Sequence, residues 1–138
     1  MSRPNWCDYF MQIAYDVAAR SPDPSTQHGC VLVGDDMSIL STGYNGPPSG
    51  VDRYPTERPA KYDYFLHAEQ NALLYCKGRP VAAYITGPPC ATCAKMLLQA
   101  GVRLIVFGDR IAKCLTDEGM DAVRDMAEQV GCVMVQHG

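Results

Sequence analysis

Two short motifs, His67-Ala68-Glu69 and Pro89-Cys90-Ala91-Thr92-Cys93, place the strongest demand on how this chain folds. Imidazole and thiol groups bind transition metals, and two cysteines separated by two residues lie one turn apart where a helix begins. Both sulfurs can then reach one ion. The chain must therefore bring two helix starts together, one carrying His67 and the other carrying the cysteine pair.

The hydrophobic pattern predicts an alternation of helices and strands. Apolar residues recur at steps of three and four in the first segment, as in a helix with one buried face. A Gly34-Asp35-Asp36 turn between two short apolar runs predicts an antiparallel hairpin. The predicted elements are a helix over 5–20, hairpin strands over 30–34 and 38–44, helices over 67–76, 93–100 and 118–130, and strands over 81–86, 103–107 and 132–136.

This order predicts an α/β fold in one domain spanning residues 1–138. Strands separated by helices are joined by right-handed crossovers, so the last three strands should be parallel. We expect a three-layer α/β/α sandwich around a mixed five-stranded sheet. The segment from residue 45 to about 63 has no regular pattern, and irregular segments of this length in small domains are usually functional.

Composition excludes several classes of protein. The formal charge is −3 and the twelve Lys and Arg residues are scattered, which argues against a nucleic-acid partner. The sequence contains no apolar run long enough to cross a membrane, and its first twenty residues lack the pattern of a signal peptide. We therefore expect a cytoplasmic protein with reduced thiols and a small-molecule substrate.

The motifs predict a catalytic zinc site with His67, Cys90 and Cys93 as ligands. The positive end of a helix favours thiolate over thiol at Cys90 and Cys93. Three protein ligands leave the fourth tetrahedral position open for water. Because two thiolates cancel the charge of Zn²⁺, the water needs a base beside it, and Glu69 is placed to be that proton shuttle.

Two other readings of the cysteine pair are a redox couple and half of a structural zinc site. A structural site needs a fourth protein ligand, and none of the remaining candidates has paired spacing with the motif. These candidates are Cys76, Cys114, Cys132, His28 and His137. The two helix starts also lie at one edge of the predicted sheet, where α/β folds place their catalytic sites.

The glycine-rich turn after the hairpin is a candidate for substrate binding. Asn45 either ends the hairpin or binds a sugar hydroxyl, with loop residues such as Ser49 near a phosphate. Ser25 and Thr26 are either helix-cap residues or phosphate donors. Tyr75 is expected to pack rather than to bind a ligand.

These residues resemble the deoxycytidylate (dCMP) deaminases of the cytidine deaminase superfamily along nearly the whole chain. The zinc motifs identify the superfamily, and two further stretches are typical of the dCMP enzymes. These stretches are Asp23-Pro24-Ser25-Thr26-Gln27 and Gly43-Tyr44-Asn45-Gly46.

The resemblance implies hydrolysis of dCMP to dUMP and ammonia, with Asn45 on the deoxyribose. It also implies a homohexamer that is activated by dCTP and inhibited by dTTP, with Mg²⁺ on the triphosphate. The residues carried over to that effector pocket are Asn45, Gly46, Asn71 and Tyr75.

Three departures from the family pattern change what can be transferred. The segment before His67 contains no cysteine, so the second structural zinc of some viral relatives is not expected. Gly108-Asp109-Arg110-Ile111 lacks a tyrosine that packs on the substrate in relatives. Gly78 stands where some relatives have an arginine near the catalytic helix, which affects the expected allosteric control.

The competing functions are a free-cytidine deaminase, a tRNA adenosine deaminase and a nucleotide-sensing zinc protein without turnover. The helix predicted before the last strand disfavours the cytidine enzyme, whose last strands are antiparallel in that family. The acidic balance disfavours a tRNA substrate. The presence of Glu69 disfavours the sensor, since a structural zinc needs no carboxylate beside it.

Overall fold

The computed structural model describes residues 2–138 and shows a five-stranded sheet covered by helices on both faces. The strands are β1 (Gly29–Val33), β2 (Ile39–Tyr44), β3 (Ala82–Ile85), β4 (Leu104–Phe107) and β5 (Val133–Gln136), in the spatial order β2-β1-β3-β4-β5. β1 pairs antiparallel with β2 and β3, whereas β3, β4 and β5 are parallel. The predicted mixed sheet with parallel last strands is confirmed.

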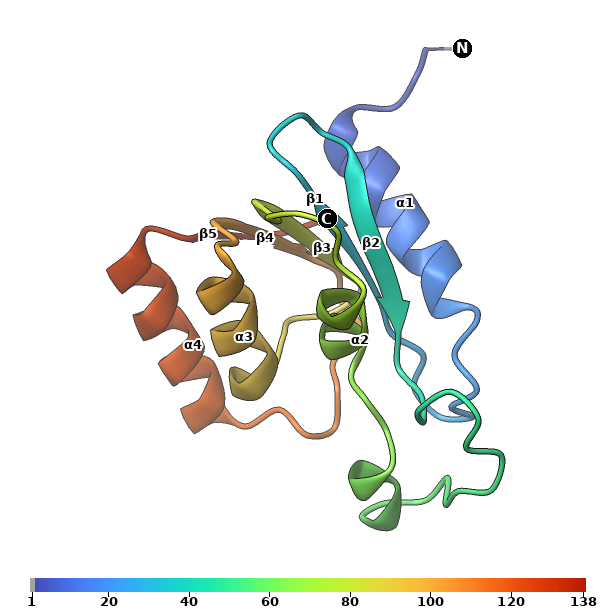
Figure 1. Ribbon diagram of the computed structural model, residues 1–138. Coiled ribbons are helices and arrows are strands. Elements are labelled where there is room, and N and C mark those ends of the chain that lie inside the picture. The colour runs from blue at the N-terminus through green and yellow to red at the C-terminus, as the bar shows by residue number, and fades with distance from the viewer. Residues whose placement is uncertain (1) are drawn as a thin grey trace.

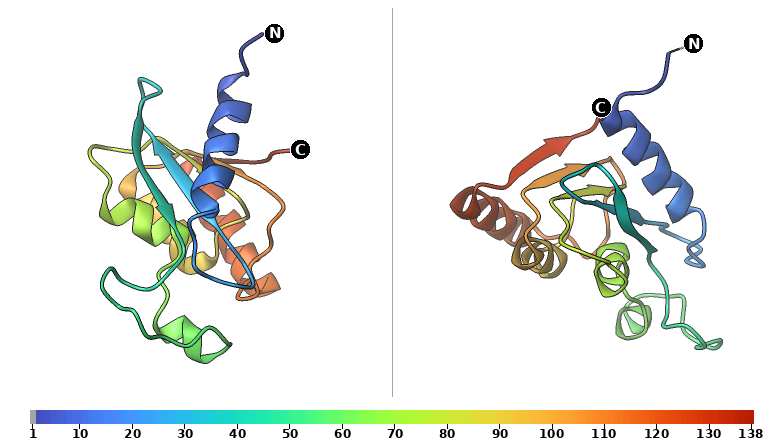
Figure 2. Two further views of the ribbon diagram at one scale, coloured as in Figure 1. Left: turned by 90° about the vertical axis from the view of Figure 1, so that its right-hand side faces the viewer. Right: turned by 45° about the horizontal axis from the view of Figure 1, so that its top comes forward.

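The helices form two unequal layers (Figure 1, Figure 2). The first, α1 (Trp6–Ala18), covers one face of the sheet alone. The other face carries α2 (Ala68–Leu74), α3 (Ala91–Ala100) and α4 (Asp117–Val130). The predicted three-layer sandwich is confirmed.

Alternate residues of the central strands supply the two cores. In β1, Cys30 and Leu32 pack under α2 and α3, whereas Val31 and Val33 pack against α1. Strand side chains alternate between faces, and a strand buried on both sides must be apolar throughout. All five residues of β1 are buried, which explains its continuous apolar run.

Helix α2 lies unusually close to β2 because of a glycine. A Cβ at Gly43 would collide with backbone atoms of Ala72 and Ala68, so only glycine lets the helix rest on the strand. The hydroxyl of Ser41 adds a hydrogen bond to the carbonyl oxygen of Ala72 at 2.6 Å. These contacts fix the position of the helix start that follows His67.

Helix ends follow local sequence rules. The Asn5 side chain caps α1 by accepting the Asp8 N–H, and the Thr116 hydroxyl caps α4 by accepting the Gly119 N–H. Gly101 and Gly131 end α3 and α4 in the left-handed conformation. The helix predicted to begin at Cys93 begins at Ala91 instead, because Cys90 is its cap residue.

The segment between β2 and α2 projects beyond the start of α2 (Figure 1) and contains one short 3₁₀ helix, η1 (Ala60–Asp63). Two backbone hydrogen bonds between Gly46 and Leu66 close the base of this loop. The two ends of this loop are therefore held together by backbone hydrogen bonds. No helix within residues 2–138 is both long and apolar enough to cross a membrane.

Candidate active site

The starts of α2 and α3 bring three metal-ligating side chains together. His67 is the N-cap of α2, Cys90 is the N-cap of α3, and Cys93 lies in the first turn of α3. The His67 Nδ1 atom is 3.2 Å from Cys93 Sγ and 3.5 Å from Cys90 Sγ. Ligand atoms around a tetrahedral Zn²⁺ with ordinary bond lengths are about 3.5 Å apart, so the donor set fits that ion.

Glu69 lies in the first turn of α2 beside these ligands. Glu69 is only 6% exposed, and this burial raises the pKa of its carboxyl to about 7. The negative charge of Cys90 also raises that pKa. A carboxyl that titrates near neutrality can both take and give a proton there. The backbone N–H of His67 donates to the Gln70 side chain at 2.8 Å, which holds the start of the helix.

The sulfurs have unequal acidities. Hydrogen bonds from the thiols of Cys114 and Cys93, in that order of importance, lower the pKa of Cys90 far below its usual range. The same contact with Cys90, together with burial, raises the pKa of Cys93. The hydrogen bond to Cys90 also raises the pKa of His67 against the opposing effect of burial. Cys90 is therefore the most acidic of the three sulfurs.

Cys114 joins this cluster, which the sequence interpretation did not anticipate. The ligand atoms of His67, Cys90 and Cys114 all lie within 4.8 Å of one another. Cys114 comes from the connection between β4 and α4, and hydrogen bonding to Cys90 raises the pKa of its thiol. Cys114 is one of the candidates without paired spacing to the motif, and an irregular connection, not motif spacing, brings it to the cluster.

A cavity of about 660 Å³, including its open mouth, adjoins the cluster. His67, Glu69 and Cys90 line it, and three cationic side chains also face it: Arg58 and Lys61 from the covering loop, and Lys113 from the connection that carries Cys114. Although the whole chain is acidic, this cavity can hold an anionic group close to the metal-ligating residues.

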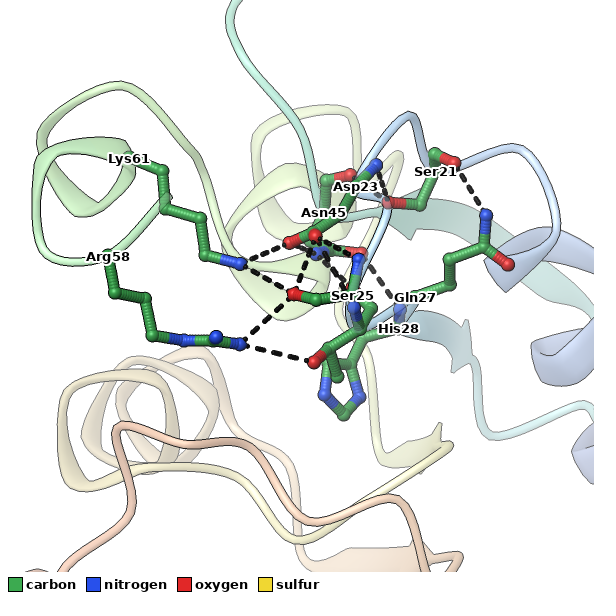
Figure 3. Close-up of polar contacts among 9 residues, drawn as sticks. Ser21, Asp23, Ser25, Gln27, His28, Asn45, Arg58 and Lys61 are labelled. Atoms are coloured by element: carbon green, nitrogen blue, oxygen red, sulfur yellow. Dashed lines mark hydrogen bonds and ion pairs between the residues drawn. The ribbon is translucent and has the colours of Figure 1, made fainter. Parts of the chain in front are cut away.

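Asp23, which also lines the cavity, organises the loop between α1 and β1 (Figure 3). Its Oδ1 atom accepts hydrogen bonds from the backbone N–H groups of Ser25 and Thr26 and from the Ser25 hydroxyl. Its Oδ2 atom pairs with the Lys61 ammonium at 2.8 Å. Burial alone would raise the pKa of Asp23, but these hydrogen bonds outweigh it and lower the pKa.

The structure places the four predicted substrate residues differently. Asn45 is buried and lines the cavity, but its side chain is engaged with protein: Oδ1 accepts the His28 N–H at 2.8 Å, and Nδ2 donates to the Thr26 carbonyl oxygen at 3.0 Å. Thr26 also lines the cavity. Ser25 and Ser49 are exposed and do not line it, although the Ser25 hydroxyl contacts Arg58 and Lys61.

The residues assigned to an effector pocket do not share this cavity. Of the four, only Asn45 lines it. The Asn71 side chain donates to the Tyr44 carbonyl oxygen, and Gly46 pairs through its backbone with Leu66. Tyr75 ends α2 and is 64% exposed.

Sequence reasoning missed four kinds of cavity residue: the loop cations Arg58 and Lys61, the cation Lys113, the third thiol Cys114, and His28, whose ring contacts the buried Thr86. No local pattern marks them, because each reaches the site through a contact distant in sequence. The one available hint was the length of the irregular segment that carries Arg58 and Lys61.

Comparison with known proteins agrees with this geometry. The profile of the cytidine and deoxycytidylate deaminase zinc-binding region matches residues 4–109. The fold and the site thus define a member of the cytidine deaminase superfamily that carries the region described by this profile. The chain belongs to the cytidine and deoxycytidylate deaminase family, and its matches include several deoxycytidylate deaminases.

Relatives differ in how much of their length the chain spans. The mouse deoxycytidylate deaminase is 39% identical over 113 residues, which cover 74% of this chain but only 64% of that protein. The match thus spans just under two thirds of these longer relatives. The deoxycytidylate deaminase of Mycobacterium phage D29 is 34% identical over 125 residues, covering 78% of this chain and 97% of that protein.

Solved structures show the same fold. The dCMP deaminase of cyanophage S-TIM5, solved in complex with dCMP and dUMP, superposes with a TM-score of 0.80 at 26% identity and covers 99% of this chain and all of that one. The cytidine deaminase of Mycobacterium tuberculosis covers 76% of this chain and 85% of its own length at 20% identity, with a TM-score of 0.55. The latter likeness concerns the fold alone.

Proposed function

We propose that this chain deaminates dCMP hydrolytically, giving dUMP and ammonia and so supplying the precursor of thymidylate. The observation that carries the proposal is one cavity lined by two chemically distinct sets of residues. One set comprises His67 and Cys90 together with Glu69, and the other comprises the cations Arg58, Lys61 and Lys113. A cytosine nucleotide has a matching pair of ends, an exocyclic amine and a phosphate.

Three of the chain's residues would hold the metal. His67, Cys90 and Cys93 are the proposed ligands, and a Zn²⁺ ion bound there would supply an acidified water. The family profile includes all three residues but ends before Cys114, which favours this ligand set over one that includes Cys114.

Glu69 is the proposed proton carrier. Its carboxylate would accept a proton from the attacking water and pass a proton to the ring nitrogen next to the amine-bearing carbon. The same carboxyl would then protonate the departing amine. Because Glu69 is only 6% exposed, bulk water has little access to compete for these protons.

The phosphate would lie against the loop cations. The Arg58 Nη2 atom is 3.2 Å from Ser25 Oγ and 3.3 Å from Thr26 Oγ1, so a guanidinium and two hydroxyls lie together beside the cavity, which Arg58 and Thr26 line. Such a group can bind phosphate through charge-assisted hydrogen bonds. Ser25 and Thr26 thus retain their proposed place near the phosphate, with Arg58 as the group that carries the charge.

Two enzymatic alternatives have less support. A free-cytidine substrate would leave the cations that line the cavity without a partner, and the parallel pairing of β4 with β5 matches the arrangement expected for the dCMP enzymes. A tRNA substrate would need a wide basic surface, which a net charge of −3 does not favour. A sensor without turnover would not require Glu69 beside the ligands.

Regulation and assembly form a second part of the proposal. By kinship, the active form would be a cytoplasmic homohexamer that dCTP activates and dTTP inhibits, with Mg²⁺ accompanying the triphosphate. The exposed Tyr75 at the end of α2 is available for contact with another subunit or an effector.

The direct test measures ammonia release from dCMP by purified, zinc-loaded protein, with deoxycytidine, cytidine and an RNA stem-loop as competing substrates. We expect a kcat/KM for dCMP that exceeds that for deoxycytidine, and turnover that rises with dCTP and falls with dTTP. Absence of dCMP turnover with zinc confirmed by metal analysis would overturn the proposal.

A further inference from the structure

His28 is a cavity residue to which the proposed function gives no role. It directly precedes β1, and its ring lines the same cavity as His67, Glu69 and Cys90. Its backbone N–H is fixed by the Asn45 side chain at 2.8 Å. In Figure 3 the imidazole points away from the cluster of Ser21, Asp23 and Asn45.

A neighbouring hydroxyl sets which ring nitrogen carries the proton. Thr86 is fully buried, and its Oγ1 atom accepts the backbone N–H of Gly29 at 3.2 Å and lies 3.0 Å from His28 Nδ1. If the Thr86 hydroxyl donates its proton to His28 Nδ1, Thr86 makes one hydrogen bond as a donor, to His28, and one as an acceptor, from the Gly29 N–H. If Nδ1 donated instead, the buried hydroxyl proton would have no acceptor among these contacts. The network therefore makes Nδ1 the acceptor and Nε2–H a donor.

That donor makes no hydrogen bond within the described residues. Within residues 2–138, Nε2 of His28 is the one buried side-chain nitrogen or oxygen that makes no hydrogen bond. Buried polar groups in native proteins are nearly always paired, and the exceptions concentrate at sites that await a ligand or serve catalysis. An orphan donor in the wall of a substrate cavity is such an exception.

The charge state of the ring agrees with this geometry. Burial is the main cause that lowers the pKa of His28 to about 4, and the positive charges of Arg110, His67 and Lys61 lower it further. The negative charge of Asp23 has a smaller effect that raises the pKa. The ring is therefore neutral at pH 7. A neutral ring suits an uncharged acceptor better than a phosphate, which would pull the pKa upward.

We propose that His28 is a substrate-binding residue whose Nε2–H donates a hydrogen bond to an uncharged oxygen of the bound cytosine nucleotide. This inference rests on the proposed function and assigns a contact at the same site. Two oxygens of a cytosine deoxynucleotide have the required chemistry, namely the carbonyl oxygen of the base and the 3′-hydroxyl of the sugar. Thr86 acts through His28 and is a positioning residue.

Kinetics of matched variants test the contact. His28→Phe keeps a flat ring without a donor, and His28→Gln restores an N–H donor on a side chain of similar reach. For dCMP we expect kcat/KM to fall about tenfold in His28→Phe, the effect of one lost hydrogen bond. His28→Gln should recover a large part of that loss. His137→Phe, which removes an imidazole paired with Asp8 outside the cavity, is the control.

A nucleotide analogue separates the two oxygens. With 2′,3′-dideoxycytidine monophosphate, a penalty for His28→Phe that disappears assigns the contact to the 3′-hydroxyl, and a penalty that persists assigns it to the base carbonyl. Either result supports the donor. Equal kcat/KM for dCMP in wild type and His28→Phe, with both proteins carrying zinc, overturns it.

A spectroscopic readout keeps the inference testable even if His28→Phe does not fold. In ¹⁵N-labelled wild-type protein, two-bond nitrogen–proton spectra should show His28 protonated at Nε2. Addition of dUMP should change the ¹⁵N chemical shift of that Nε2 atom. Thr86→Val should allow both tautomers. A ring protonated at Nδ1 in wild type, or an Nε2 signal that saturating dUMP leaves unchanged, contradicts the inference. Failure of wild type to deaminate dCMP would instead count against the proposed function.

Discussion

Lys61 and Asp23 form a buried ion pair, 2.8 Å between Nζ and Oδ2, in which the two side chains are only 5% and 2% exposed. Lys61 belongs to the loop that covers the cavity, and Asp23 belongs to the turn after α1. The pair joins the two segments that supply Arg58 and Thr26 to the cavity wall. It therefore links the stability of the fold to the shape of the proposed phosphate site.

Removal of one partner should destabilise the protein strongly. Lys61→Met leaves the Asp23 carboxylate buried without its cation, and we expect a loss of about 3 to 5 kcal/mol in the free energy of unfolding. Urea unfolding at pH 7 measures this loss. The exposed pair Arg124 and Asp121 supplies the control, since Arg124→Met should change the free energy of unfolding by no more than about 0.5 kcal/mol.

The same pair predicts a dependence of stability on pH. The folded protein lowers the pKa of Asp23 below its ordinary value of 3.8, so the folded state binds the proton less readily than the unfolded state. The stabilisation is complete above that ordinary value and is lost as pH falls through the lower, folded pKa. Unfolding curves of wild type and of Asp23→Asn/Lys61→Met should therefore converge below pH 3.8. A constant difference down to the acid limit would contradict this assignment.

Arg58 should determine the preference for a phosphorylated substrate. With Arg58→Ala we expect kcat/KM for dCMP to fall about 10- to 100-fold, the effect of losing a charge-assisted contact, while kcat/KM for deoxycytidine stays nearly unchanged. Arg53→Ala is a matched control, because Arg53 is exposed on the same loop and does not line the cavity. Equal losses on both substrates would show that Arg58 acts on the fold and not on phosphate.

The metal content of cysteine variants should distinguish the two possible ligand sets. We expect Cys114→Ser to keep about one zinc per chain, because His67, Cys90 and Cys93 complete the set. Cys93→Ser should lose zinc during gel filtration with a mild chelator. If Cys93→Ser keeps zinc and Cys114→Ser loses it, the ligands are His67, Cys90 and Cys114 instead.

Glu69→Ala should separate metal binding from chemistry. Glu69 is buried beside the ligands but is not one of them, so zinc should remain at about one per chain while dCMP turnover falls by a factor of about 10² or more. Metal analysis and ammonia release measure the two quantities. Glu128→Ala, on the exposed face of α4, controls for the loss of a carboxylate. Turnover equal to wild type in Glu69→Ala would exclude the proton-carrier role.

Local patterns predicted the sheet and the two helix starts, because their signals lie within a few residues of each other. A short continuous apolar run located β1, and the spacing of Cys90 and Cys93 located the start of α3. Contacts that join distant segments could not be predicted this way. Asp23 meets Lys61 across 38 positions, and Cys114 reaches Cys90 through a connection without regular structure.

The orphan donor of His28 illustrates the same limit. Its meaning depends on Thr86, which lies 58 positions away, and on the burial of Nε2 in the assembled cavity. In the sequence His28 is one unassigned imidazole among three. Only the folded arrangement distinguishes it from His137, whose Nε2 reaches Asp8 at 2.8 Å near the surface.

His67 and Cys90 occupy the N-cap positions of α2 and α3, where a serine or an aspartate would ordinarily accept a hydrogen bond from the first turn. Here the side chains at both caps turn toward each other and are free to hold an ion between them. A bound zinc would then act as a shared cap that joins the N-termini of two helices, each of which follows a different strand. Formation of the two helix starts would be coupled to metal binding, so that the fold would be completed when the active site binds its ion.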